Sequence, residues 1–217
     1  MNELNHSNHS KRIATNTLVL FARMLIITIV NLYTVRWVLK GLGTEDYGIY
    51  NAVAGVVTTG TCISSVLAMA TQRFYSYAIG LGEKEKLTRI FSASVNLVIV
   101  FSIITILVLD LVGNWFVSTL MTIPVDRLSA ASWVFQFSIF SFVFTLLQIP
   151  YIGAIFSNED MGVYALVSSV DCFIKLMIAA LICMFGIDHL ILYSGGMMIE
   201  SGLVMVVYML VASRKYI

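Results

Sequence analysis

Charged side chains are scarce in this chain. Only 12% of its 217 residues are Asp, Glu, Lys or Arg, whereas 59% are hydrophobic. A soluble domain usually carries about 25% charged residues, so the composition excludes an ordinary water-soluble fold. The chain also contains only two prolines and 14 glycines, which argues against long disordered linkers.

The motifs of several enzyme classes are absent from the sequence. It contains no Gly-Lys-Ser/Thr phosphate-binding loop, no His-Glu-x-x-His zinc motif and no nucleophile elbow. We therefore expect neither an enzyme nor a metal or cofactor site, and no nucleic-acid partner. The three cysteines match no metal-binding spacing, and we interpret all three as buried structural thiols: Cys62, Cys172 and Cys183.

Long apolar runs fill most of the chain. Each is about 20 residues or longer, which spans a ~30 Å hydrocarbon core at ~1.5 Å per residue. The runs are continuous rather than alternating, which favours helices over barrel strands. The sequence predicts an all-α fold, a polytopic transmembrane helix bundle in which a polar tail, 1–12, precedes one unit, 13–217, of about six spans: 13–39, 47–71, 91–113, 131–154, 162–184 and 190–212.

The distribution of Lys and Arg predicts the orientation in the membrane. With a cytoplasmic N-terminus, eight basic residues fall in inner segments and three in outer segments, as the positive-inside rule requires. Both termini are then cytoplasmic. The inner residues are Lys11, Arg12, Arg73, Lys84, Lys86, Arg89, Arg214 and Lys215, and the outer ones are Arg36, Lys40 and Arg127.

We interpret four charged residues as embedded in the membrane, where ionisable groups are costly and often functional: Arg23, Asp171, Lys175 and Glu200. They belong to polar stripes, because residues seven or eleven positions apart share one face of a helix. The first span carries Asn16, Arg23 and Thr34 on one face, with Asn31 about 60° away. The fifth carries Tyr164, Ser168, Asp171 and Lys175, and the sixth carries Tyr193, Gly196 and Glu200.

These stripes allow more than one interpretation. Asp171 and Lys175 are four residues apart and could neutralise each other within one helix. Arg23 and Glu200 could form a clamp between two helices. Alternatively, the stripes line a hydrated cavity, in which Arg23 and Lys175 contact an anionic group such as a diphosphate. Asp171 and Glu200 would then be coupling or gating acids.

Three segments, taken in order, resemble bacterial polysaccharide flippases of the Wzx-like kind, within the multidrug/oligosaccharidyl-lipid/polysaccharide exporter superfamily. They are "VRWVLKGLGTEDYGIYNAVAGVV" (35–57), "TQRFYSYAIGLGEKEKL" (71–87) and "LQIPYIGAIFSNEDMGVYA" (147–165). One departure is Asp160, where the family usually has Arg or Lys. The matching signature residues are Gly43, Asp46, Tyr47, Gly48, Tyr50, Arg73, Pro150 and Glu159.

The resemblance implies a transporter of the bacterial inner membrane that moves polyprenyl-diphosphate-linked glycan from the cytoplasmic to the outer leaflet for surface polysaccharide biosynthesis. Members have two six-helix lobes, so this chain would be the N-terminal lobe, completed by a missing C-terminal half or by a homodimer partner. Two rival interpretations are a cation-coupled multidrug exporter of the same superfamily and a non-transporting membrane scaffold or remnant.

Overall fold

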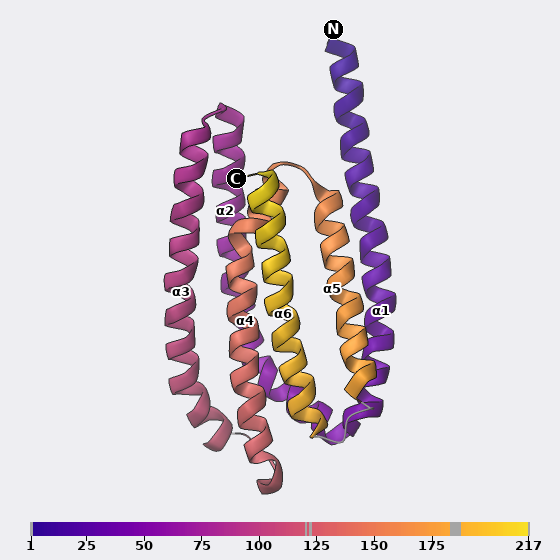
Figure 1. The fold of residues 1–217 in the computed structure, drawn as a ribbon, viewed down its shortest axis with the longest axis vertical. Helices are drawn as coiled ribbons and strands as arrows, with labels where there is room; N and C mark the ends of the chain where they lie inside the picture. The colour runs from indigo at the N-terminus through magenta and orange to yellow at the C-terminus, as the bar shows by residue number, and fades with distance from the viewer. Residues whose placement is uncertain (1, 120, 122, 183–187, 217) are drawn as a thin grey trace.

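The computed structural model describes residues 2–119, 121, 123–182 and 188–216, and in this part of the chain the fold is all-α. Six α-helices run roughly along one axis, and the two termini lie toward the same end (Figure 1). The helices are α1 (Asn2–Thr58), α2 (Thr61–Leu81), α3 (Lys84–Thr119), α4 (Leu128–Ser157), α5 (Met161–Leu181) and α6 (His189–Lys215), with a 3-10 turn, η1 (Val125–Arg127), before α4.

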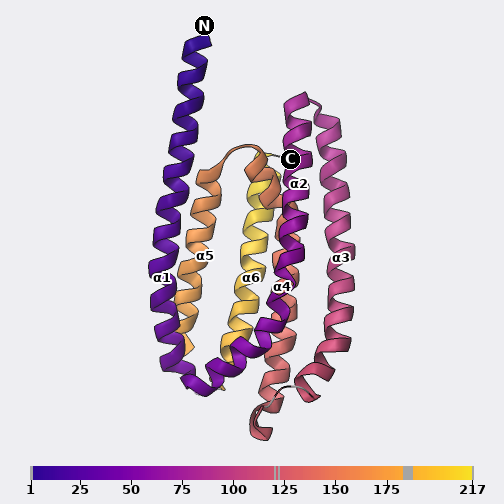
Figure 2. The same cartoon turned by 180° about the vertical axis from the view of Figure 1, so that it is seen from behind.

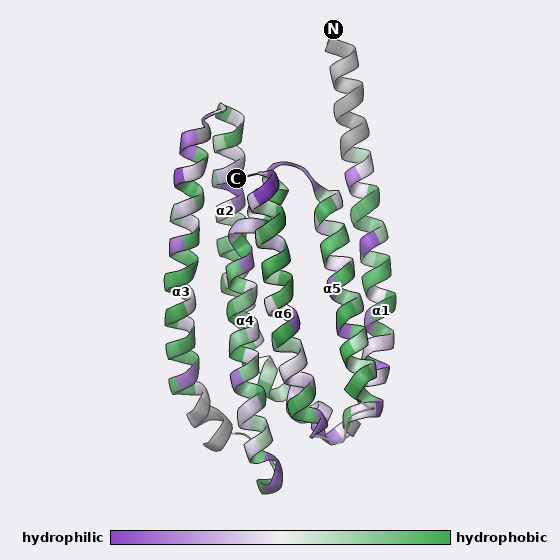
Figure 3. Ribbon diagram, in the orientation of Figure 1, coloured by the Kyte–Doolittle hydropathy of each residue, from purple (hydrophilic) through white to green (hydrophobic). Residues whose placement is uncertain are grey.

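Five segments of the described chain are long and apolar enough to cross a membrane: Ala14–Thr58, Glu85–Gly113, Val125–Ser157, Met161–Leu181 and His189–Lys215. This length and hydropathy are those of a multi-pass membrane protein. Figure 3 shows apolar residues along most of the helices, with hydrophilic residues gathered near their ends. The predicted third to sixth spans correspond to α3–α6. Helix α3, Lys84–Thr119, extends beyond the predicted span 91–113 at both ends.

The structure breaks the chain between the predicted first and second spans. Two helical arms of α1 meet at Gly43, where the chain reverses and where the backbone is not helical, with a left-handed φ of 82°. Glycine adopts this φ without the steric cost of a Cβ. Beyond Gly43 the second arm of α1 crosses the end of the bundle toward α2 (Figure 2).

The predicted second span, 47–71, is kinked. Its regular α-helical bonding is interrupted at Thr59–Gly60, between α1 and α2, where the N–H of Gly60 donates to the carbonyl of Val57. A Cβ on Gly60 would lie 2.8 Å from Cζ of Phe142 on α4, so a residue without a side chain lets the two helices approach closely. Helix α2, which forms the last part of this predicted span, is not among the five segments that could cross a membrane.

Helix α4 is the centre of the bundle and packs against all five other α-helices. Its inward residues Phe135, Ile139 and Leu146 are at most 1% exposed. The outer faces are apolar as well: Leu111 of α3 is 80% exposed and Leu32 of α1 is 71% exposed. Such faces are unfavourable in water, whereas lipid tails are as apolar as these side chains.

Candidate functional site

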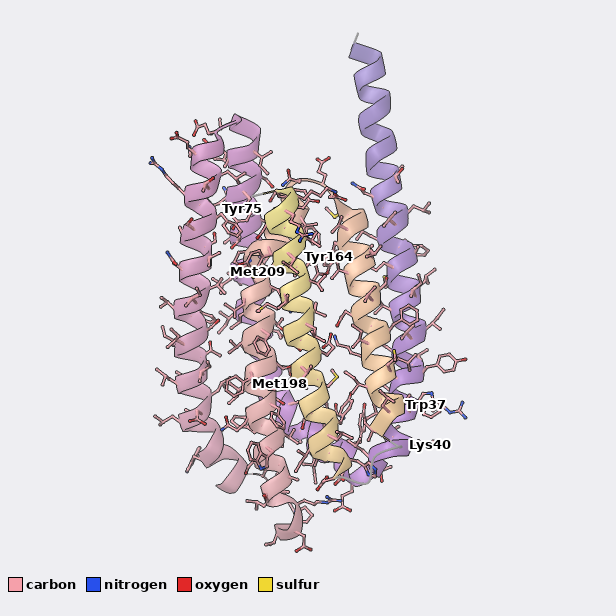
Figure 4. The ribbon with its side chains drawn as sticks, in the orientation of Figure 1. Trp37, Lys40, Tyr75, Tyr164, Met198 and Met209 are labelled. Atoms are coloured by element: carbon pink, nitrogen blue, oxygen red, sulfur yellow. The ribbon has the colours of Figure 1, made fainter. Side chains whose placement is uncertain are left out.

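Arg23 of α1 contacts the polar stripe of α5. Its Nε donates to the hydroxyl of Ser168, and an NH2 donates to the hydroxyl of Tyr164 at 3.2 Å. The guanidinium also lies over the Tyr164 ring, 4.4 Å from the centroid, which is cation–π geometry. Tyr164 in turn stacks near Tyr208 of α6, with ring centroids 6.4 Å apart, and Figure 4 labels it between α5 and α6.

Two other residues of the α1 stripe also contact the chain around α5. The side-chain amide of Asn16 donates to the backbone carbonyl of Glu159 at 3.1 Å. The thiol of Cys172 lies 3.6 Å from Oδ1 of Asn31. The stripe predicted on α1 therefore meets α5 along its length. Thr34 is buried, but its hydroxyl donates to Val30 of its own helix.

The embedded charges of α5 and α6 form a second cluster. Lys175 Nζ lies 2.9 Å from Oδ1 of Asp171 and 3.9 Å from Oε1 of Glu200. Glu200 is 1% exposed, and its Oε1 makes no hydrogen bond. Its other oxygen lies 3.4 Å from the Ser201 hydroxyl. One cation is thus shared between two acids, of which only Asp171 is within hydrogen-bond distance.

These contacts bear on two of the interpretations of the stripes, the neutralising pair and the clamp between helices. Asp171 and Lys175 pair within α5, as the neutralising interpretation predicts. The Arg23–Glu200 clamp is not formed, because Arg23 bonds to Ser168 and Tyr164 while Glu200 lies beside Lys175. The hydrogen-bond partners of Arg23 are therefore neutral hydroxyls, and neither is a carboxylate.

The signature residues of the second arm of α1 lie near the opposite end of the bundle from the termini. Asp46 is 6% exposed and pairs with Arg127 at 3.1 Å. Tyr50 meets Tyr193 of α6 edge-on, with centroids 4.8 Å apart. Tyr47 packs against the main core, whereas Gly48 is exposed.

The remaining signature residues have separate environments. Arg73 is exposed on α2, and Pro150 is buried inside α4. Glu159 has a φ of 57° in the turn between α4 and α5. Asp46 and Tyr50 link the second arm of α1 to η1 and to α6, whereas the other signature residues lie elsewhere in the described chain, so the signature is dispersed rather than gathered at one site.

Arg127 is a residue whose role the sequence did not reveal. It pairs with Asp188 at 2.9 Å as well as with Asp46, so one guanidinium joins η1, the second arm of α1 and the start of α6. Asp188 also caps α6 by accepting from the backbone N–H of Leu190. The sequence did contain a signal for Asp188, because an acid just before an apolar run is typical of a helix N-cap.

Asp110 is a second residue whose contact the sequence did not reveal. It lies inside the predicted third span, and its carboxylate accepts from the Gln136 amide of α4 at 2.7 Å. The thiols were predicted only in part. Cys172 is buried as expected, Cys62 is exposed, which corrects that prediction, and Cys183 lies outside the described residues.

The turn between α4 and α5 is tied to the end of α6. The Asp160 carboxylate accepts hydrogen bonds from Lys215 Nζ and from the Tyr216 hydroxyl, the latter at 2.6 Å. The hydrogen bond from Lys215 has the larger effect, and together with the bond from Tyr216 it holds the pKa of Asp160 below its ordinary value. Burial and the bond to Asp160 raise the pKa of Tyr216. The acid that departs from the flippase pattern therefore has a structural partner in this chain.

Two cavities in the described part of the chain are lined by several helices of the bundle. The larger, about 460 Å³, opens near the end where α2 meets α3, and it is bordered by Tyr75, Phe91 and Tyr216. Tyr75 is fully buried, and its hydroxyl makes no hydrogen bond; Figure 4 labels it near that end. The smaller cavity, about 180 Å³, lies between the second arm of α1, α4 and α6.

No group of three or more His, Cys, Asp or Glu side chains in the described chain is arranged to hold a metal ion. No protein-family model, no curated protein and no solved structure matches this chain. What the site does must therefore be argued from its own geometry.

Proposed function

We propose that this chain is one lobe of a membrane flippase that moves lipid-diphosphate-linked oligosaccharide across the bacterial inner membrane. The observation that carries this proposal is the environment of Arg23. Its partners are the hydroxyls of Ser168 and Tyr164, so its positive charge is oriented by them but is not neutralised by them. A guanidinium offers five N–H donors in a fork that fits phosphate oxygens.

In this proposal the diphosphate binds beside Arg23 while the lipid tail stays in the bilayer. Lys175 is a weaker candidate for the same role, because Asp171 already binds it at 2.9 Å. Transport by alternating access needs a second lobe, either another copy of this chain or a different six-helix unit. The resemblance of the segment around Asp46 and Tyr50 to flippases supports the same assignment.

The test is complementation of a flippase-deficient bacterial strain by the gene as it stands, with Arg23→Ala and Arg23→Lys variants. We expect Arg23→Ala to abolish glycan export and Arg23→Lys to retain part of it, because lysine keeps the charge but loses the bidentate fork. The matched control is Arg36→Ala, which removes an exposed arginine from the same helix. Protein in the membrane fraction is measured for every variant.

Normal export by Arg23→Ala at normal membrane abundance would refute the role of Arg23. A loss of export in Arg36→Ala as well would show that the effect is not specific to the seam between α1 and α5. Failure of the unaltered chain to complement, alone or with a second lobe, would favour the scaffold or remnant interpretation.

A cation-coupled exporter is the second candidate, and it is favoured by Glu200. This carboxylate is 1% exposed and has one oxygen without a hydrogen bond, which is the environment of a group that takes up a proton or a cation in a transport cycle. Efflux of an organic-cation dye that depends on Glu200 but not on Arg23 would support this candidate over the flippase.

A further inference from the structure

A break between two helices borders the smaller cavity. Helix α1 ends at Thr58 and α2 begins at Thr61, and both residues contribute to the cavity wall. The rest of the wall comes from the centre of α4 and from α6. Interrupted helices at membrane depth are tolerated where they line a cavity, and transporters use them to bind substrates and ions.

The cavity wall is rich in hydroxyl groups, and their protons are already committed. Six Ser and Thr hydroxyls of the wall each donate to a backbone carbonyl within 3.2 Å, and they belong to Thr58, Thr61, Ser138, Ser141, Thr145 and Ser194. A hydroxyl has one proton and two acceptor lone pairs. What these residues can offer to a ligand is therefore acceptors.

The other side chains of the wall carry no charge. Tyr50, Phe137 and Phe142 supply aromatic surface, and Ala54, Val57 and Met197 are apolar. A cation held here would have no neighbouring carboxylate in the wall to offset its loss of hydration, which is costly inside a membrane. A neutral group with several O–H donors and an apolar ring face avoids that cost.

The size of the cavity narrows the ligand further. Its volume of about 180 Å³ corresponds to roughly six water molecules at ~30 Å³ each. That is too large for a single bare metal ion, and it is comparable to one six-membered ring with its substituents.

We propose that this cavity binds one neutral sugar ring, whose hydroxyls donate to the Ser and Thr oxygens while its C–H face packs on Phe137 or Phe142. The site lies on α1, α2, α4 and α6, apart from the contacts between Arg23 and α5. The proposed sugar site rests on the proposed function for the source of the ring, which would be the transported glycan. The geometry of the cavity does not depend on that function.

The test uses the full chain in lipid nanodiscs, free of sugar-based detergent. Saturation-transfer NMR is recorded with glucose and with N-acetylglucosamine as probes. We expect transfer to the ring C–H protons of at least one sugar. Ala54→Leu, which places a larger side chain in the cavity, should reduce the transfer at least severalfold. Ala52→Leu, exposed on the same helix, should leave it unchanged.

A second pair of variants tests the chemistry rather than the space. Ser138→Ala removes a cavity acceptor and should weaken binding ~2- to 10-fold, as expected for one hydrogen bond. Ser132→Ala removes the same kind of hydroxyl, bonded to the i−4 carbonyl of the same helix but outside the cavity wall, and should have no effect.

The proposal would be overturned by equal saturation transfer to the sugar in Ala54→Leu and Ala52→Leu, or by no transfer to either sugar. It would also be overturned if the protein responded to NaCl but not to choline chloride or sugar, which would indicate a cation site. The outcome is separable from that of the proposed function. Sugar binding together with normal export by Arg23→Ala would support the sugar site and refute the flippase role of Arg23. Absence of sugar binding together with loss of export by Arg23→Ala would refute the sugar site and support the role of Arg23.

Discussion

Replacing Gly113 with alanine tests the packing of α3 on α4. A Cβ at position 113 would lie 1.9 Å from Cζ of Phe135 and 2.3 Å from its Cε1. Phe135 is fully buried in the first half of α4. For ordinary contact at 3.4 Å the ring would have to recede by about 1.5 Å, and closely packed neighbours resist a shift of that size.

The expected cost follows from two opposing effects. Overpacking a core by one methyl group destabilises a protein by about 1–3 kcal/mol. Alanine is better than glycine within a helix by about 0.5–1 kcal/mol. We therefore expect Gly113→Ala to lower the free energy of unfolding by about 1–2 kcal/mol, measured by reversible denaturation in mixed micelles. Gly80→Ala is the matched control, because a Cβ there meets nothing within 4 Å.

A double-mutant cycle then isolates the contact. Phe135→Leu alone removes ring volume and should be destabilising, but it also makes room for the new methyl group. The Gly113→Ala, Phe135→Leu pair should therefore be more stable than the sum of the single effects predicts, by about 1 kcal/mol or more. Additive effects, or a Gly113→Ala cost no larger than that of Gly80→Ala, would refute the packing of these two residues.

Two further predictions concern the ends of the bundle. Arg127→Ala should destabilise the protein by about 1–3 kcal/mol, because it removes the partner of the buried Asp46 and of Asp188. The same denaturation assay measures this effect, and an unfolding free energy equal to that of the unaltered protein would contradict it. The lowered pKa of Asp160 contributes stability at pH values above the ordinary aspartate pKa, and this contribution is lost as pH falls toward the pKa in the folded state. Between about pH 5 and pH 3, the unfolding free energy of Asp160→Asn should therefore fall less than that of the unaltered chain, and parallel pH profiles would show that the bond from Lys215 has no such effect.

The helices were predictable because lipid imposes a simple rule on the sequence. A segment that crosses the hydrocarbon core must be apolar over about 20 residues, and α3–α6 follow that rule. The kink in the second predicted span was not predictable from hydropathy. Hydropathy does not distinguish a continuous helix from one interrupted at Gly60, a position where a Cβ would lie 2.8 Å from Cζ of Phe142 on α4.

The candidate site was predictable in its membership but not in its pairing. Helical spacing placed Asn16 and Arg23 on one face, and both contact the chain around α5. Spacing within a helix cannot show which helix lies opposite, so Arg23 was equally compatible with Glu200. The Arg127 contacts were not predictable for the same reason, because Asp46 and Asp188 are far from it along the chain.

The packing of α1 bears on how the bundle is assembled during synthesis. Its main contacts are with α5, α4 and α6, all of which follow it in the chain. Its first arm bonds through Arg23 to Ser168, 145 residues later. Because α1 is synthesised before α5, its polar face is not covered by α5 until that later helix has formed. Until then the face can be solvated only by lipid headgroups, water or the insertion machinery.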